Sequence, residues 1–295
     1  MTTQDAQALV DQGIQQLIEE PQAWKQWAST YARFTQYSPG NVLLIMSQKP
    51  DATMVAGYHA WQALGRQVQK GEHGLTILAP VTKKELDPEH PKDPPKARLV
   101  GFRAATVFDL SQTQGRELDL PTPKALTGNH LKDLLDHVIQ SAVPVPVAFA
   151  KMTDAYGVWS PTEQRIQIKD DAEPNQQFKT LMHEWSHSIG VSTPDQAVNR
   201  HVGTEEVTAE TTAYILSKSV GLDTQQYSQG YVAGWSKGDP KAVLAVQAEV
   251  AHRVHAITQA LQAAAGRDPV IAEVVQRWQP PKKVQQPEFA QEISR

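Results

Sequence analysis

The chain has 295 residues, no cysteine, 40% hydrophobic residues and a formal net charge of −4. The lack of cysteine excludes disulfides and leaves histidine and carboxylates as the ligands for any zinc site, while the hydrophobic content argues against global disorder. No apolar run approaches the ~18 residues that cross a bilayer, and the first ten residues lack the pattern of a secretory signal. We therefore expect a cytoplasmic protein with no membrane partner.

The first half of the chain predicts a mixture of helices and strands. Residues 3–18 have helical periodicity, and Pro21 opens a second helix whose aromatic residues share one buried face: Trp24, Trp27, Tyr31 and Phe34. Further helices are expected over 42–46 and 59–64, a β-hairpin or sheet edge over 68–78, and a strand over 99–108. The charged, proline-rich segment 82–97 predicts an exposed loop.

The second half begins after a linker predicted at residues 120–123. A helix over 127–142, a strand over 145–150 and a hairpin formed by 156–159 and 165–168 are expected first. Helices then follow over 174–190, 203–220, 239–265 and 268–277. The fold class is therefore α+β, with a small α+β domain at residues 1–121, a second domain of a short sheet plus helices at 122–279, and a flexible tail at 280–295.

A metal site is predicted on the helix at 174–190. His183 and His187 are four residues apart, so both imidazoles project from one helix face and can hold one Zn²⁺. Glu184 lies beside that face, where it can act as general base towards a water on the metal. The strand around Ile166–Ile168 is a candidate sheet edge for an extended peptide.

The third ligand is expected on the next helix. We assign Glu206 as ligand and Glu210 as the acceptor that fixes a histidine tautomer, with the reverse assignment still open. Glu205 is expected to be solvated. Tyr214, Tyr231 and His201 are candidates for oxyanion stabilisation, although packing or surface exposure is the preferred interpretation for each. Two histidines and a glutamate favour Zn²⁺ over Mn²⁺.

Several motifs resemble known families. Met182–His187 followed by Glu205–Glu210 resembles gluzincin metallopeptidases of the ImmA/IrrE and ArdC kinds. Four N-terminal motifs resemble, in this order, the single-stranded-DNA-binding domain of ArdC antirestriction proteins: Tyr37–Leu44, Trp61–Val68, Lys70–Gly74 and Val107–Thr113. The resemblance covers about residues 10–265. It implies a non-specific single-stranded-DNA-binding domain followed by a zincin-like metallopeptidase domain, in a protein of mobile genetic elements that protects incoming DNA from restriction.

The local charge agrees with a nucleic-acid partner for the first half, because residues 25–118 hold 12 Lys and Arg against 8 Asp and Glu. Single strands are held by basic grooves and by aromatic faces on which bases stack. The residues that fall in the family-like motifs are the predicted DNA contacts: Tyr37, Asn41, Trp61, Arg66 and Lys70. Core packing is the alternative for both aromatic residues.

Three functions remain open at this point. The first is a single-stranded-DNA-binding antirestriction protein whose zinc site is structural or vestigial. The second is an active DNA-associated zinc metalloprotease that cleaves a protein substrate. The third is a soluble zinc peptidase whose first domain binds protein. The first is preferred, and whether the chain is an enzyme stays open.

Overall fold

The computed structural model describes residues 1–20, 22–85, 96–118, 129–190, 202–222 and 236–276. The chain divides into two compact units. The first unit contains Met1–Gly13 and Gly40–Arg116, and the second contains Ile14–Pro39 and Glu117–Arg295. Both mix helices with short sheets, so the predicted α+β class is confirmed. Among the described helices, none combines the length and the apolar character needed to span a bilayer.

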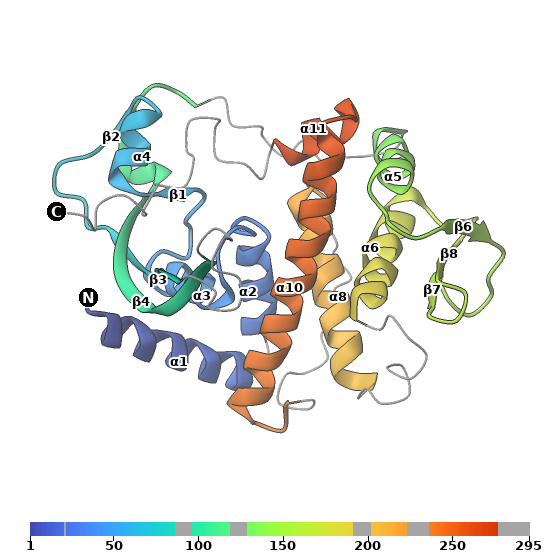
Figure 1. The fold of residues 1–295 in the computed structure, drawn as a ribbon, viewed down its shortest axis with the longest axis horizontal. Helices are drawn as coiled ribbons and strands as arrows, with labels where there is room; N and C mark the ends of the chain where they lie inside the picture. Colours follow the sequence, from blue (N-terminus) through green and yellow to red (C-terminus); the bar gives the residue numbers. More distant parts are fainter. Residues whose placement is uncertain (21, 86–95, 119–128, 191–201, 223–235, 277–295) are drawn as a thin grey trace. The chain divides into compact units, whose positions relative to one another are not determined.

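The first unit is organised around a long antiparallel ribbon of two strands. Its elements, in chain order, are the start of α1 (Thr3–Glu19), α3 (Pro39–Gln48), β1 (Val55–Ala56), α4 (Tyr58–Ala63), β2 (Arg66–Val68), β3 (Leu75–Glu85), β4 (Lys96–Asp109), the 3-10 turn η1 (Leu110–Gln112) and β5 (Thr113–Gly115). The ribbon of β3 and β4 curves strongly (Figure 1), and β1 pairs with the far side of β4.

The predicted hairpin over residues 68–78 is wrong in its pairing. β2 pairs with β5, whereas β3 pairs with β4. The segment between β2 and β3 bends around Gln112, whose side-chain amide donates to Glu72 Oε2 and to the carbonyl of His73, each at 2.8 Å. Strand partners distant in sequence therefore replace the predicted local hairpin. The alternative prediction of a sheet edge is confirmed, because β3 is the end strand of its sheet.

Helix α3 covers the free edge of β3 with side-chain amides. Asn41 donates to the carbonyl of Leu78 at 3.0 Å and accepts from the N–H of Leu78 at 2.8 Å. Gln48 makes the same reciprocal pair with the backbone of Thr76, both at 2.8 Å. The two amides thus satisfy the backbone groups that an edge strand would otherwise leave unpaired.

The second unit is mainly helical. Its elements, in chain order, are the end of α1, α2 (Ala23–Tyr31), α5 (Asn129–Ser141), β6 (Val147–Ala150), β7 (Gly157–Ser160), β8 (Arg165–Lys169), α6 (Pro174–Gly190), α8 (Val202–Ser219), α10 (Pro240–Ala265) and α11 (Pro269–Val275). These bounds confirm the predicted order of elements. Helix α8 lies between α6 and α10 (Figure 1) and contacts both.

The helix starts of this unit follow local capping chemistry. Asp239 accepts a hydrogen bond from the N–H of Lys241 at the start of α10, and Asp268 accepts from Val270 and Ile271 at the start of α11. A proline follows each aspartate at the first helical position, where its missing N–H costs nothing. Such signals explain why these two helices could be located from sequence.

The α2 helix belongs to this unit although it precedes most of the first unit in sequence. The indole N–H of Trp24 donates to Thr211 Oγ1 at 3.1 Å, and Ser29 Oγ lies 2.6 Å from the Tyr214 hydroxyl. The aromatic face predicted from helical spacing is buried, with exposures between 0% and 2%: Trp24, Trp27, Tyr31 and Phe34. The core of the second unit therefore includes a helix from near the start of the chain.

A three-stranded sheet packs beside α6, in the order β6-β8-β7. β8 runs parallel to β6 and antiparallel to β7, so it is the central strand. The prediction that residues 166–168 form a free sheet edge is therefore wrong, because both sides of β8 are paired. β7 and β6 are the strands at the ends of this sheet.

Some predictions concern residues outside the described ranges. They are the linker at 120–123, most of the loop at 82–97, and the tail at 280–295.

Candidate metal centre

Helix α6 carries the histidine pair. Pro174 is its first residue, and its apolar residues are fully buried: Phe178, Leu181, Met182 and Trp185. Burial of this stripe fixes the rotation of the helix, since a helix must turn its apolar face to the core. The histidines at positions 183 and 187 lie one turn apart on a face that points towards α8.

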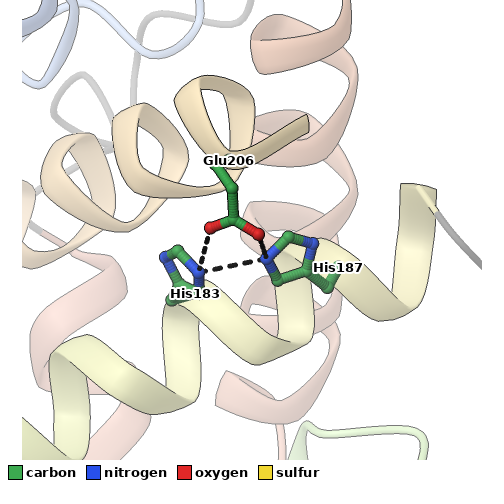
Figure 2. Close-up of side chains that lie close together, drawn as sticks. All are labelled: His183, His187 and Glu206. Atoms are coloured by element: carbon green, nitrogen blue, oxygen red, sulfur yellow. Dashed lines mark hydrogen bonds and ion pairs between the residues drawn. The ribbon is translucent and has the colours of Figure 1, made fainter. Parts of the chain in front are cut away.

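Two histidines and a glutamate converge between α6 and α8 (Figure 2). The Nε2 atoms of His183 and His187 are 3.0 Å apart. Glu206 Oε2 lies 3.4 Å from His183 Nε2, and Glu206 Oε1 lies 3.5 Å from His187 Nε2. Bonds of about 2.0–2.2 Å in a tetrahedral site place ligand atoms roughly 3.3–3.5 Å apart, so this triangle has the size of a metal site.

The other ring nitrogen of each histidine faces a carboxylate of α8. His183 Nδ1 lies 3.4 Å from Glu210 Oε2, and His187 Nδ1 lies 3.1 Å from Glu205 Oε1. A neutral imidazole that donates from Nδ1 presents a lone pair at Nε2. Both lone pairs then point at the same place as the Glu206 carboxylate, which is the donor set of a divalent cation.

The charges of the two histidines and the nearby glutamates influence one another strongly. Burial of His183 opposes its charged form, but the carboxylates of Glu206 and Glu210 outweigh burial and raise its pKa to about 9. The pKa of His187 is raised in the same way, against burial, by Glu205 and Glu206. Contacts with the two histidines hold the pKa of Glu206 far below its ordinary value. Cationic charge is therefore stabilised where the three side chains meet.

Glu184 is buried beside the histidine pair. Its surroundings raise its pKa, mainly through burial, although the two nearby histidines and a hydrogen bond from the N–H of Trp159 oppose that shift. It lines a cavity of about 200 Å³ with residues of β7, α6 and α8: Tyr156, Gly157, Gln176, Lys179, Thr180, His183 and Glu210. A buried carboxylate with a raised pKa next to a cavity can accept a proton from a bound water.

Gly157 allows β7 to approach this cavity closely. A Cβ atom at that position would lie 2.3 Å from Thr180 Cγ2 and 3.1 Å from Glu184 Cγ. Only a residue without a side chain therefore brings the strand this near to Glu184.

Two charged residues near the centre were not anticipated. Lys179 Nζ lies 2.6 Å from Glu210 Oε1, and helical spacing one turn before His183 was the available signal. Arg253 of α10 forms a two-pronged contact with Glu205. Glu205 is only 8% exposed, so the expectation that it is solvated is wrong. The signal for Arg253 was a lone arginine on the apolar stripe of α10, between Val250 and Ile257.

Two of the predicted DNA contacts are engaged inside the first unit. Trp61 is fully buried, and its indole N–H donates to the carbonyl of Phe108 at 2.9 Å. A base cannot stack on a ring that the core encloses, so the structure corrects this prediction to its packing alternative. Asn41 is 8% exposed, and its side-chain amide both donates to and accepts from the backbone of Leu78. Asn41 is therefore also removed from a binding surface.

The other three predicted contacts have mixed surroundings. Arg66 is partly exposed, but its guanidinium donates to Thr113 Oγ1 and to the carbonyls of Thr113 and Arg116. Lys70 is exposed. Tyr37 belongs to the second unit and makes an edge-to-face contact with Phe34, and burial raises its pKa to about 12. Their role in DNA binding stays a prediction.

Of the oxyanion candidates, Tyr214 is 3% exposed and its hydroxyl contacts Ser29, so packing is its role in this structure. Tyr231 and His201 lie outside the described residues.

A family model and a curated relative both match parts of the chain. Residues 4–108 match the family model described as the N-terminal domain of anti-restriction factor ArdC. An uncharacterized protein of Bacillus anthracis, pXO2-81, is 26% identical over 264 residues, an alignment that covers 76% of this chain. The chain spans only 45% of the length of that relative.

The comparison with solved structures includes two matches to one protein, of which the first shows a similar fold. The Mn(II)-bound crystal structure of the antirestriction protein ArdC from plasmid R388 matches with a TM-score of 0.55 and 19% identity, over 89% of this chain and 99% of that one. Its metal-free structure matches with a TM-score of 0.48 and 20% identity, over 83% and 87% of the two chains.

Proposed function

We propose that the chain is an ArdC-like antirestriction protein that binds single-stranded DNA without sequence preference. The match of residues 4–108 to the ArdC N-terminal domain is the observation that carries this proposal. The protein would act in the cytoplasm, on behalf of a mobile element, by covering incoming DNA.

The β3–β4 ribbon supports this role and suggests where the strand binds. Directly opposite residues of an antiparallel pair share one face. Lys83 lies opposite Arg98, and Arg103 lies opposite Ala79. Ala79 and Lys83 are four residues apart on β3 and so point to the same face, which therefore carries all three cations. We call Lys83, Arg98 and Arg103 the cationic ribbon face. Its charges suit the phosphates of a nucleic acid.

Aromatic and apolar side chains lie exposed on the other face of this ribbon, because Phe102 lies opposite Pro80 and Leu99 lies opposite Thr82. Phe102 is 54% exposed and Leu99 is 53% exposed. A phenylalanine ring open to solvent offers a base a stacking surface worth about 1–3 kcal/mol. We propose that Phe102 takes the role that the sequence suggested for Trp61.

The second part of the proposal is a divalent metal held by His183, His187 and Glu206. The converging Nε2 lone pairs and the size of the triangle support it. We propose Zn²⁺ as the ion because two histidines and a glutamate are ligands that suit it. The R388 ArdC protein supports a divalent metal more generally, since its crystal structure is Mn(II)-bound. When bound, such an ion supplies Lewis acidity and a water of lowered pKa.

An active metallopeptidase is the second candidate function, and the position of β7 favours it. The N–H of Ile166 in β8 donates to the carbonyl of Pro146, on the β6 side of the strand. Ile166 therefore makes no backbone bond to Trp159, its partner in β7, and the N–H and C=O of Trp159 point away from β8. One of them, the N–H, bonds Glu184. Gly157, two residues earlier, shares that orientation, and an extended peptide could pair with this edge beside Glu184.

In that case Glu184 would take the proton of the attacking water, and Lys179 and Glu210 would hold His183 in position. This function requires that Glu184→Gln abolish cleavage of a protein substrate and leave DNA binding intact. If antirestriction needs only DNA binding, the same variant keeps its biological effect.

The test of the main proposal is fluorescence anisotropy of a labelled single-stranded oligonucleotide at low and high salt, with a duplex for comparison. We expect preference for the single strand and a steep loss of affinity with salt. Lys83→Gln/Arg98→Gln should weaken binding and reduce the salt slope by about 1–2, since each single-strand phosphate contact contributes roughly 0.7. Phe102→Ala should weaken binding with little change in slope.

Lys132→Gln/Lys241→Gln is the matched control, because it removes two exposed positive charges from the second unit. No binding at low salt would refute the proposed function. Equal losses in the ribbon variant and the control would refute the ribbon as the binding surface.

A further inference from the structure

A buried ion pair joins α10 to α8 directly behind the histidine pair. Arg253 is 0% exposed. Its two terminal nitrogens donate to Glu205 Oε1 and Oε2, both at 2.8 Å, and one of them also lies 3.3 Å from Ser186 Oγ. Among the described residues, its Nε atom is buried without a hydrogen-bond partner.

Such a pair is weak evidence for stability. Removing two charges from water costs several kcal/mol per ion, and replacing a buried pair by apolar residues is often neutral or stabilising. The unpaired Nε adds to that cost. A function other than stability would account for the pair.

Glu205 extends the contact to the candidate metal centre. Its Oε1 atom, which accepts from Arg253, also lies 3.1 Å from His187 Nδ1. A carboxylate fixed by two bonds to a buried arginine cannot easily rotate away from the imidazole. His187 therefore has one preferred donor position, at Nδ1, and turns its Nε2 towards His183 and Glu206.

The arrangement differs from that around His183. Glu210 is the carboxylate beside His183 Nδ1, and it is 3.4 Å away and also paired with Lys179, whose side chain is 17% exposed. The Arg253–Glu205 pair is two-pronged and closed to solvent, and Glu205 lies nearer to its histidine, at 3.1 Å. Of the two carboxylates, Glu205 is therefore the more rigidly held.

We propose that Arg253 and Glu205 are positioning residues for the metal: together they fix the tautomer and orientation of His187, and so set the affinity of the site. The proposal rests on the metal site proposed above and assigns residues that bind no metal themselves. Outer partners of this kind change metal affinity by roughly 10- to 100-fold in general.

The test separates positioning from simple packing. In Glu205→Leu/Arg253→Met both charges are replaced by apolar side chains, which is expected to keep the fold. Affinity for Zn²⁺ and for Mn²⁺ is measured on the purified full chain by competition with a chromophoric chelator. We expect a thermal midpoint close to that of the wild type and affinity reduced by about 10- to 100-fold.

Asp268→Asn is the matched control. It weakens another buried carboxylate of the second unit, which accepts from His137, Ser141 and the start of α11, and it should leave metal affinity unchanged. Wild-type affinity in the double variant would overturn the positioning role while leaving the metal site intact. A wild type that binds metal no better than His183→Ala/His187→Ala would overturn both proposals.

If the double variant does not melt cooperatively, Arg253→Lys replaces it. Lysine keeps the positive charge beside Glu205 but cannot make the two-pronged contact. A smaller, several-fold loss of affinity is expected, and an unchanged affinity would contradict the proposal.

Discussion

Three glutamates within six residues of α8 have three different environments. Glu205 is locked against Arg253, Glu206 faces both Nε2 atoms, and Glu210 bridges His183 and Lys179. Because these residues project in different directions from the helix, each has its own position around the histidine pair. Glu206 faces the place of the candidate cation, whereas Glu205 and Glu210 contact the Nδ1 atoms of the two imidazole rings.

The raised pKa of His183 would make metal binding at the candidate centre dependent on pH. With a pKa of about 9, the metal-free imidazole carries a proton at pH 7. That charge stabilises the metal-free fold fully below the unfolded pKa of ~6.5, and the contribution is lost as pH rises through about 9. A ligand imidazole must be neutral, so the proton and the metal compete.

We therefore expect Zn²⁺ binding at pH 7 to release at least one proton, and the apparent affinity to rise about tenfold per pH unit until it levels off above about 9. Calorimetric titrations in buffers with different ionisation enthalpies count the released protons. Affinity independent of pH between 6 and 9 would contradict the assignment of His183 as a ligand.

At the same scale, sequence predicts some site residues and misses others for a physical reason. His183, His187 and Glu184 share one helical turn, so their relation follows from helix geometry alone. Arg253 lies on a helix distant in the chain, and only tertiary packing brings it to Glu205. Trp61 could not be assigned because a buried tryptophan and a stacking tryptophan have the same local sequence.

At the scale of elements, local patterns predicted helices and strands well, but not which strands are neighbours. β7 and β8 are joined by a short turn, and their hairpin was predictable. The parallel pairing of β6 with β8 is non-local, and it decides that β8 is central and β7 is at the end. The peptide-binding edge of the second candidate function moves from one strand to the other for that reason.

The contact of α3 with the edge of β3 gives a prediction at this scale. Asn41→Ala should reduce the free energy of unfolding by about 2 kcal/mol, because it leaves the N–H and C=O of Leu78 without partners. Urea denaturation measures the change, and Ser47→Ala, on an exposed position of the same helix, is the control. Unchanged stability together with weaker DNA binding would return Asn41 to the DNA-binding surface.

At the scale of the whole molecule, the two compact units are not two consecutive stretches of sequence. Residues 14–39 pack with residues 117–295, whereas the predicted domain boundary lies at 121/122. A change in composition at a linker can indicate where the chain is loosely structured, but it carries no information on which core an earlier helix joins. The predicted boundary stays a proposal about evolutionary modules.

A fragment of residues 122–279 should therefore be poorly folded. It lacks the aromatic residues of α2 and the bonds from Trp24 and Ser29 to α8, so large cavities would open in its core. We expect no cooperative thermal transition by circular dichroism, and recovery when a peptide of residues 14–39 is added. A fragment that melts as sharply as the full chain, without the peptide, would show that α2 is dispensable.

The bond between Trp24 and Thr211 links residues 187 positions apart. During synthesis at about 5–20 residues per second, the aromatic face of α2 leaves the ribosome roughly 10–40 s before its partner helix. For that time the three large aromatic side chains of α2, Trp24, Trp27 and Tyr31, have no core to enter. The nascent chain thus presents an early and long-lived binding site for chaperones, and its yield in cells should depend on them more than its final stability suggests.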